Sequence, residues 1–391
     1  MRLAERGHKV TVVTSRCGYD NAALRFPSRE TWRGINIHRV RSTRLGKSAK
    51  WRRAVDFASF TAACCLRLIS LPRHDAIVAL TSPPLIAFVG AGLVSAWRSK
   101  FFYWVMDLNP DEAIAAGWLR PDSFGAKVLN GMSRFSLRRA DKVIALDRFM
   151  CDRLLAKGIP AEKIAVIPPW AHDDAVRYDP AGRERFREAH GLKDKFVVMY
   201  SGNHSPCHPL DSLMDAARRM AGQPQIAFCF VGGGSEFAKI QRFAEQHGLS
   251  NVRCLPYRPL DQLAASLSAA DLHVVVMGDR FVGIVHPCKI YNILTVGVPV
   301  LYIGPRPSHI TEILDILPNG LQCAAKHGDI DTIIRHIQRL SLAVSRTEIS
   351  SFKETAARFA KENLLPKLVE ELETEGPTAG EPKADEAIAA K

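Results

Sequence analysis

Short runs of apolar residues alternate with helix-like patterns along almost the whole chain. Because each strand is followed by a helix that must cross back over the sheet, this order predicts parallel sheets covered by helices. We therefore expect an α/β fold with two Rossmann-like parallel-sheet domains facing a cleft. The predicted strands are a segment ending at residue 14, then 35–40, 75–80, 101–106, 142–146, 163–167, 196–200, 226–231, 252–255, 273–277 and 298–303.

The length of 391 residues favours two domains, because a single hydrophobic core seldom grows so large. A polar stretch between Pro169 and Pro180 marks the boundary, and the charge balance changes there. The predicted units are an N-terminal domain over 1–170, a linker over 171–183, a C-terminal domain over 184–350, one amphipathic helix over 351–375 interrupted at Pro366, and a disordered tail over 376–391.

The first residues predict the end of a helix, a stop at Gly7 and then a buried strand, so the chain begins inside a βαβ unit. In a doubly wound sheet the strand that should precede this helix is central, and its loss would expose an edge on each neighbour. We therefore expect that the natural protein begins upstream of Met1, with an N-terminal truncation in this sequence.

Positive charge is concentrated in the first half: residues 1–180 hold 29 Lys and Arg against 16 Asp and Glu, and residues 181–391 hold 24 of each. A basic run leads into an apolar helical pattern over 55–71, a composition typical of an interfacial membrane contact. The alternatives are a solvated basic loop and, third, a nucleic-acid surface, which the scarcity of aromatic residues disfavours. The predicted membrane-contact residues are Arg44, Lys47, Lys50, Arg52 and Arg53.

Nine cysteines without a CxxC pair argue against a disulfide framework or structural zinc and favour a reducing cytoplasm. No uninterrupted apolar span of membrane length occurs, so we expect a cytoplasmic protein bound at most to the surface of the membrane. The spacings within the candidate metal ligands match no zinc signature, and no metal is expected. These candidates are His204, Cys207, His208, His286 and Cys288.

The stretch over 281–304 predicts a loop, a helix that begins near Pro287 and ends at Gly297, and a buried strand. Lys289 stands at the start of this helix beside free backbone N–H groups, which is the arrangement that an anionic group such as a diphosphate requires. Glycine turns at Gly202-Asn203 and at 232–234, together with the loop over 256–259, follow strands of the same domain and should lie on the same rim.

A second polar cluster follows the predicted strand over 101–106. Asp107, Asp111 and Glu112 lie just past the carboxyl end of that strand, where open α/β sheets bind ligands, so they are candidates for a general base or for contacts with substrate hydroxyls. The alternative is a helix start, because Asn109 and Pro110 suit the first turn of a helix. We weigh the two interpretations equally.

Several motifs together resemble the retaining glycosyltransferases of family 4, which have the GT-B fold, and most resemble the bacterial subgroup that builds exopolysaccharide, O-antigen or colanic-acid glycans. The resemblance extends over nearly the whole chain. The matching segments are Leu3-Ala4 with Gly7-His8, Asp107-Leu108 with Pro110-Asp111, Ala140-Asp141 with Val143, Ile167-Pro168, Tyr200 to Asn203 with His208, Ala270-Asp271, Pro287 with Lys289, Tyr291-Asn292, and Gly297 with Pro299.

The resemblance implies a UDP- or GDP-linked sugar donor in the C-terminal domain, a lipid-linked glycan acceptor in the N-terminal domain, and no cofactor. Lys289 and Asp107 would be catalytic, and Asp107, Asp111 and Glu112 would face the acceptor. Gly202 and Asn203 would lie beneath the diphosphate, Tyr257 and Arg258 would flank the base, and Asn292 would reach ribose or sugar hydroxyls. The implied donor-binding residues are Gly202, Asn203, His208, Gly233, Tyr257, Arg258, Lys289, Tyr291 and Asn292.

The sequence departs from the family pattern at several positions. Ile284 and Asn292 stand where many members have a pair of glutamates, and His208 stands where a phosphate-binding lysine is common. An amide still bonds hydroxyls as donor and acceptor, so Asn292 keeps a possible ribose contact. Two other functions remain open: a nucleotide-sugar epimerase of the same fold, and a non-catalytic truncated relative. Hydrolase motifs of the GxSxG and HExxH types are absent from the sequence.

Overall fold

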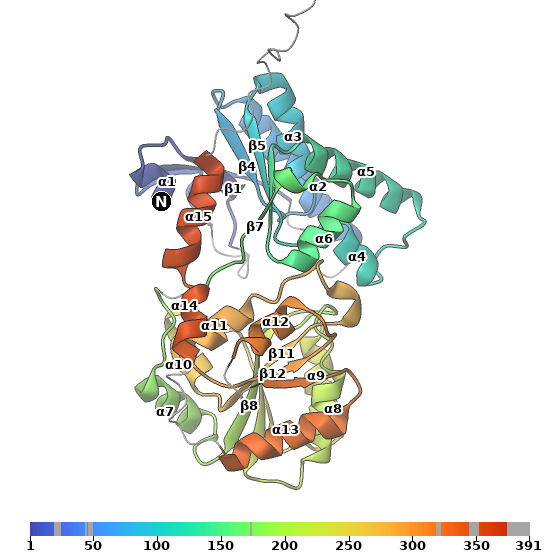
Figure 1. Ribbon diagram of the computed structural model, residues 1–391, viewed down its shortest axis with the longest axis vertical. Helices are drawn as coiled ribbons and strands as arrows, with labels where there is room; N and C mark the ends of the chain where they lie inside the picture. Colours follow the sequence, from blue (N-terminus) through green and yellow to red (C-terminus); the bar gives the residue numbers. More distant parts are fainter. Residues whose placement is uncertain are drawn as a thin grey trace, which may run out of the picture.

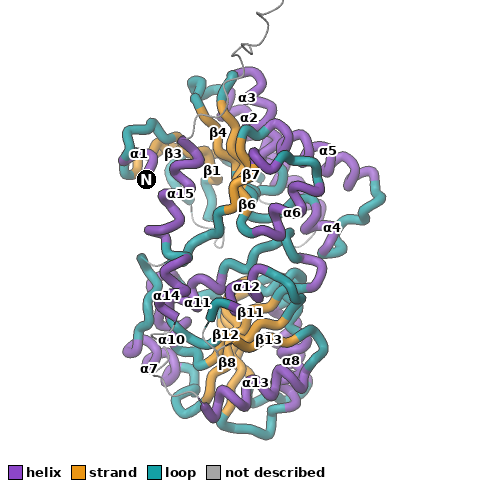
Figure 2. Tube along the Cα trace, in the orientation of Figure 1, coloured by secondary structure: helices purple, strands orange, loops and turns teal. Residues whose placement is uncertain are grey.

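The computed structural model describes residues 1–18, 25–43, 45, 50–172, 174–317, 322–343 and 352–373. The chain forms two α/β domains that lie one above the other in Figure 1. In each domain the strands gather at the centre and the helices lie outside them, as Figure 2 shows. The predicted α/β class, with two domains built on parallel sheets, is confirmed.

The C-terminal domain contains a six-stranded parallel sheet in the order β10-β9-β8-β11-β12-β13. The strand order reverses between β8 and β11, and open parallel sheets bind ligands at such a reversal. The sequence prediction missed β13, whose Gln-Cys-Ala-Ala composition lacks β-branched residues. The strands are β8 (Phe196–Asn203), β9 (Ile226–Gly233), β10 (Val252–Leu255), β11 (Leu272–Val276), β12 (Val300–Ile303) and β13 (Gln322–Ala325).

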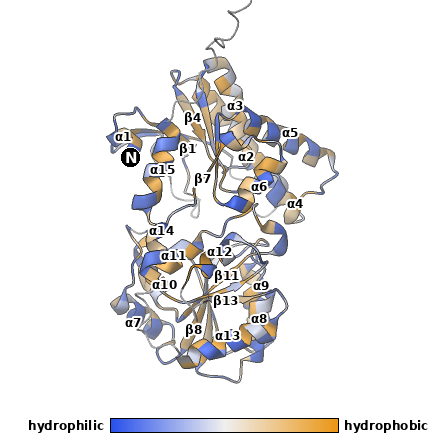
Figure 3. Ribbon diagram, in the orientation of Figure 1, coloured by the Kyte–Doolittle hydropathy of each residue, from blue (hydrophilic) through white to orange (hydrophobic). Residues whose placement is uncertain are grey.

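Helices cover both faces of this sheet because its strands are apolar on both sides. Val198 and Tyr200 point to one face and pack with α8, α9 and α13, whereas Val197 and Met199 point to the other and pack with α10 and α11. Figure 3 shows hydrophilic and hydrophobic residues alternating along α13, as an amphipathic helix requires. The helices are α7 (Pro180–Ala189), α8 (Asp211–Arg219), α9 (Phe237–Gln246), α10 (Leu260–Ser268), α11 (Lys289–Val296), α12 (His309–Asp315) and α13 (Ile330–Ala343), with a 3-10 turn, η2 (Asp279–Phe281).

The strands of the N-terminal domain form two separate sheets. One is four-stranded and parallel, in the order β4-β5-β6-β7, and the other is three-stranded, in the order β1-β3-β2. A single Rossmann-like layer was expected, and no described strand hydrogen-bonds β1 to β4. The strands are β1 (Thr11–Ser15), β2 (Arg29–Trp32), β3 (Ile35–Val40), β4 (Ala76–Ala79), β5 (Lys100–Trp104), β6 (Lys142–Ala145) and β7 (Ile164–Val166).

The sequence prediction also missed β2, which pairs antiparallel with β3. A two-residue turn joins them, and both of its residues have positive φ, 47° at Arg33 and 77° at Gly34. This is the geometry of a type I′ hairpin turn, and an arginine at its first position gave no strong turn signal. The helices of this domain are α1 (Arg2–Glu5), α2 (Lys50–Ile69), α3 (Ile86–Trp97), α4 (Asp111–Ala115), α5 (Phe124–Arg139) and α6 (Arg148–Ala156), with a 3-10 turn, η1 (Ala161–Lys163). Within the described residues, no helix is long and apolar enough to cross a membrane.

Two helices, α14 (Phe352–Arg358) and α15 (Lys361–Glu373), replace the single C-terminal helix that was predicted. The break falls at 359–360, where the Phe359 ring packs against Tyr291, and Pro366 lies inside α15. The missing N–H of a proline weakens a helix, but burial of Leu364, Leu368 and Val369 holds α15 together. The predicted tail over 376–391 lies outside the described residues.

The two C-terminal helices belong to different domains. α14 packs on α11 of the C-terminal domain, whereas α15 returns to the N-terminal domain and lies near β1 in Figure 1. There Leu368 packs with Ile144 and Ile167, and Glu373 forms ion pairs with Arg6 and His8. The chain therefore crosses between the domains twice.

An aspartate at the start of one strand holds the neighbouring strand in both domains. Asp141 accepts a hydrogen bond from the backbone N–H of Phe101, and Asp271 accepts one from the backbone N–H of Val197. Asp271 also forms ion pairs with Arg183 and Arg187, whose side chains are almost fully buried. The Ala-Asp motifs at 140–141 and 270–271 thus fix strand register.

Asp271→Ala should reduce the free energy of unfolding by about 3–5 kcal/mol, because it leaves two buried guanidinium groups without their carboxylate. Urea denaturation followed by circular dichroism measures this loss. Asp331→Ala is the matched control: it breaks the ion pair with Arg219, but Asp331 is 72% exposed, so it should cost less than about 1 kcal/mol. Equal costs for the two variants would contradict a structural role for Asp271.

Candidate active site

The two predicted glycine turns lie side by side near the point where the strand order of the C-terminal sheet reverses, and the strands continue further than expected, through Asn203 and Gly233. β8 and β9 remain paired to their ends, with Gly202 opposite Gly232 and Asn203 opposite Gly233. Gly202 and Gly232 both have φ of 135°, and a Cβ atom on Gly232 would lie 2.0 Å from the carbonyl oxygen of Gly202. Only glycine fits such a contact, so the backbone forms a bare surface that a phosphate can approach closely.

Lys289 is the first residue of α11, and its ammonium group lies against the glycine turns. The Nζ atom lies 3.6 Å from the centroid of the Tyr200 ring and 3.2 Å from the position of a Cβ atom built on Gly202. This nitrogen is buried and has no hydrogen-bond partner among the described residues. Burial lowers the pKa of Lys289 to about 7. The N-cap residue, Cys288, provides no side-chain hydrogen bond, and the backbone N–H groups of Ile290 and Tyr291 donate within the first turn to the carbonyl oxygens of Pro287 and Cys288. The start of α11 therefore offers an anion the positive end of the helix dipole.

The two histidines beside Lys289 carry no positive charge at neutral pH. Burial, followed by the nearby charge of Lys289, lowers the pKa of His204 to about 4 and that of His208 to about 3. The Nδ1 atom of His208 lies 2.8 Å from the carbonyl oxygen of Val276, so Nδ1 carries the ring proton and donates a hydrogen bond to that oxygen. A neutral His208 therefore does not replace the cation that a lysine would supply, and Lys289 remains the cation of this site.

Tyr257 and Arg258, both predicted beside the base, have different environments. The Tyr257 hydroxyl donates a hydrogen bond to the carbonyl oxygen of Gly233 at 3.1 Å, and the side chain is half exposed beside the glycine turns. The Arg258 guanidinium instead lies 2.9 Å from Nε2 of His190 and over the ring of Phe186. Arg258 thus packs on α7 and the residue that follows it, and the structure does not bring it to the glycine turns.

Tyr291 and Asn292, predicted to bind the donor, are both engaged elsewhere. Tyr291 is 2% exposed, and its hydroxyl lies 2.7 Å from Nε2 of His286. The side-chain oxygen of Asn292 accepts a hydrogen bond from the backbone N–H of His172, in the segment that joins the domains. The helical position of these residues next to Lys289 was right, but their side chains face the domain junction.

The loop over 281–288 brings the two domains into contact at the predicted acceptor residues. The backbone N–H of Leu108 donates to the carbonyl oxygen of Ile284 at 2.9 Å, and Asp107 forms a β-bridge with Val285. Burial and the nearby charge of Glu112 raise the pKa of Asp107 to about 7. Glu112 in turn accepts a weak hydrogen bond from the thiol of Cys207, across the domain boundary, at 3.8 Å. Asp107 and Glu112 therefore face the C-terminal domain.

Asp111 does not join this pair. Its carboxylate forms an ion pair with Lys157 at 2.9 Å within the N-terminal domain. The helix that was weighed as the alternative does exist: α4 begins at Asp111, with Pro110 as the N-cap and without a side-chain capping bond from it. Asp111 thus agrees with the interpretation as a helix start. Asp107 and Glu112 lie where the interpretation as a ligand-facing cluster expects them.

The predicted membrane-contact residues are only partly described. Arg44 and Lys47 lie outside the described residues, and Lys50 and Arg53 belong to α2 with no description of their side chains. The Arg52 guanidinium lies 5.4 Å from the ring centroid of Trp51, which is 61% exposed. Arg52 therefore belongs to the first turn of α2, and not to the basic loop that was given as an alternative.

Comparison with known proteins identifies the family. Residues 2–170 match the family model of the glycosyl transferase 4-like domain, and residues 182–348 match that of the glycosyl transferases group 1. A protein of Escherichia coli strain K12 named as a colanic acid biosynthesis glycosyl transferase, WcaI, is 25% identical over 95% of this chain and 93% of its own length.

Solved structures agree on the fold. The sucrose-phosphate synthase of Thermosynechococcus elongatus superposes with a TM-score of 0.72 at 18% identity, over 95% of this chain and 90% of that chain. HepE of Anabaena, solved in complex with UDP-glucose, superposes with a TM-score of 0.67 at 18% identity, over 87% of this chain and 86% of that chain. The two family matches together span most of the sequence, and the chain belongs to the family 4 glycosyltransferases with the GT-B fold.

The affinity of this site for UDP should fall as the pH rises above about 7. Lys289 binds a diphosphate only in its charged form, so above its pKa of about 7 each binding event must take up a proton. The association constant should then fall by up to about tenfold per pH unit between roughly pH 7 and 9. Isothermal titration calorimetry in two buffers of different ionisation enthalpy measures both the affinity and the proton uptake.

Lys289→Arg provides the control, because a guanidinium remains charged throughout this pH range. Its affinity for UDP should stay nearly constant between roughly pH 7 and 9, without proton uptake. A pH dependence shared by the wild type and Lys289→Arg would assign the titration to another group.

Proposed function

We propose that the chain transfers a sugar from a UDP- or GDP-linked donor to a lipid-linked glycan acceptor, with retention of anomeric configuration, in the synthesis of a bacterial surface polysaccharide. Family membership supports the transfer of a sugar, and the relative named for colanic acid biosynthesis supports the polysaccharide. The observation that carries the donor site is the buried, unpartnered ammonium group of Lys289 beside the bare backbone of Gly202.

The chemistry of the leaving group explains why Lys289 is needed. As the glycosidic bond breaks, negative charge develops on the departing nucleoside diphosphate. A cation already fixed in a buried site stabilises this charge without reorganising, and the positive end of the α11 dipole adds to its effect. In this proposal Lys289 and the helix supply the positive charge at the diphosphate, so neither a metal ion nor a cofactor is assigned to the transfer step.

Asp107 is the residue proposed to contact the acceptor hydroxyl. A carboxylate whose pKa lies near 7 is a stronger base than an exposed aspartate and is still largely ionised slightly above neutral pH. Glu112 lies close enough to raise this pKa by its charge. Retention without a carboxylate nucleophile then corresponds to attack of the acceptor hydroxyl on the face that the diphosphate leaves.

Incubation of the purified chain with radiolabelled UDP- and GDP-sugars and a bacterial membrane lipid extract tests this function. We expect label on lipid from the wild type, and a loss of about 10²–10³ in kcat for Lys289→Ala by analogy with removal of one oxyanion donor. Arg258→Ala serves as the matched control, because its guanidinium packs on α7, and it should retain most activity if the chain stays folded.

Other products would assign other functions. An isomerised free nucleotide sugar would indicate the epimerase, and tight donor binding without any product would indicate a non-catalytic relative. Near-normal turnover of Lys289→Ala would remove Lys289 from the mechanism. The anomeric configuration of the lipid-linked product, measured by NMR, tests retention separately from transfer.

We also propose that the N-terminal domain binds the inner face of the cell membrane, in the cytoplasm. The excess of basic residues over 1–180 favours an anionic surface. α2 adds exposed apolar side chains along its length, among them Trp51, Leu66 and Ile69. Arg52 lies beside Trp51, and such a pair suits the boundary between lipid headgroups and acyl chains.

Co-sedimentation with vesicles tests this contact. The chain should bind vesicles rich in phosphatidylglycerol more strongly than phosphatidylcholine vesicles, and binding should weaken as salt rises. Trp51→Glu should reduce the bound fraction, whereas Trp32→Glu, on the exposed strand β2, should not. Equal reductions by the two substitutions, or equal binding to both kinds of vesicle, would contradict a contact through α2.

A further inference from the structure

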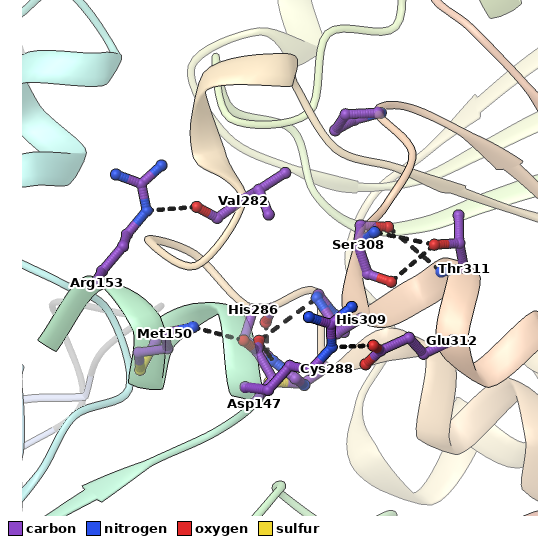
Figure 4. Close-up of polar contacts among 12 residues, drawn as sticks. Asp147, Met150, Arg153, Val282, His286, Cys288, Ser308, His309, Thr311 and Glu312 are labelled. Atoms are coloured by element: carbon purple, nitrogen blue, oxygen red, sulfur yellow. Dashed lines mark hydrogen bonds and ion pairs between the residues drawn. The ribbon is translucent and has the colours of Figure 1, made fainter. Parts of the chain in front are cut away.

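Three buried ionisable side chains meet where the two domains touch, outside the glycine turns (Figure 4). Asp147 is the N-cap of α6 in the N-terminal domain, His286 belongs to the loop before α11, and His309 is the first residue of α12. Their side chains are at most 7% exposed. One potential ligand atom from each residue lies within 4.8 Å of the others.

The hydrogen bonds of this group leave one side chain unsatisfied. Nδ1 of His286 lies 2.7 Å from Oδ2 of Asp147, and Nδ1 of His309 lies 3.5 Å from the same oxygen. Neither ring nitrogen of His309 has a hydrogen-bond partner among the described residues. The neighbouring cation, Arg148, pairs with Glu312 at the exposed rim. A buried imidazole without any partner is costly, and native structures usually satisfy such a group with water or an ion.

We propose that Asp147, His286 and His309 bind a divalent transition-metal ion, with Zn²⁺ as the ion that suits this donor set best. Two imidazoles and one carboxylate are a ligand set that zinc takes when a fourth position stays open to water. The ion lies outside the diphosphate site and has no part in the transfer step described above. The proposal therefore does not depend on the proposed function.

The surroundings of the three residues fit the support that metal ligands need. The Tyr291 hydroxyl lies 2.7 Å from Nε2 of His286 and fixes the ring orientation, so that Nδ1, which faces Asp147, is the nitrogen that would bind the ion. The backbone N–H of Met150 donates to the other carboxylate oxygen of Asp147 at 2.8 Å.

One local movement is required for binding. The rings of His286 and His309 are stacked, with centroids 3.8 Å apart and planes at 17°. Because a metal ion lies in the plane of each imidazole that binds it, the two rings must open from this stack. Rotation of the His309 side chain opens the stack without breaking a hydrogen bond of that ring, since it makes none to the described residues. The ion would take the place of the proton that His286 and Asp147 share in their hydrogen bond.

The ion would connect the two domains. Asp147 comes from the N-terminal domain and both histidines come from the C-terminal domain, and Arg153 already donates a hydrogen bond to the carbonyl oxygen of Val282 beside them. A bound ion would hold the loop over 281–288 against the N-terminal domain, and with it the contact between Asp107 and Val285.

Metal titration of the purified full chain tests the site. After removal of metal with EDTA and dialysis, calorimetry should show uptake of one Zn²⁺ per chain. Co²⁺ in its place should give visible d–d absorption without the thiolate-to-cobalt charge-transfer band that ligation by Cys288 or another cysteine would produce. Tyr291→Phe should weaken Zn²⁺ binding by about 10- to 100-fold, as the loss of an outer hydrogen bond does.

Two further variants make the test decisive. Asp147→Asn and His309→Ala should abolish the uptake and the rise in melting temperature that Zn²⁺ gives the wild type. His247→Ala removes an exposed histidine at the C-terminal end of α9, and this variant should bind Zn²⁺ as the wild type does. Melting curves in EDTA show whether each variant is folded. Absence of uptake by the wild type, a thiolate band with Co²⁺, or unchanged binding by His309→Ala would each overturn the proposal.

Discussion

The contact between the loop over 281–288 and the segment that follows β5 organises the junction of the two domains. A backbone hydrogen bond joins Leu108 to Ile284, and Asp107 pairs with Val285. The loop leads directly into α11, so the same few residues fix the position of Asp107 and that of Lys289. Ile284, which stands where many relatives have a glutamate, serves here as part of a buried backbone contact.

The electrostatics of Lys289 and Asp107 follow from their burial. Burial pushes the pKa of Lys289 and that of Asp107 towards the same value, about 7, from opposite directions. Each group is therefore partly in its neutral form at neutral pH, which reduces the cost of holding an unpaired charge away from water. A diphosphate bound beside Lys289 would favour its charged form, so the free energy of binding would include the protonation of that lysine.

The sequence predicted the features that depend on order along the chain. Alternating strands and helices indicated the α/β class, and the glycines now seen at the ends of β8 and β9 indicated a common rim, because parallel strands end at the same edge. The sequence did not indicate the contacts that Arg258, Tyr291 and Asn292 make, since it places a residue on an element but does not say which way its side chain turns. Pro366 was wrongly expected to break the last helix, because local propensity is weaker than the burial of its neighbours. The cluster of Asp147 with two distant histidines left no signal, because its members come together only through the docking of two domains.

The two crossings of the chain between the domains lie next to each other. The backbone N–H of Ala171, in the first crossing, reaches the carbonyl oxygen of Phe359, in the second, and Asn292 holds the adjacent His172 from α11. Two connections that lie side by side and are joined by a hydrogen bond constrain the rotation of one domain against the other more than a single linker would. The C-terminal helices therefore serve the junction between the domains as well as the domain on which each one packs.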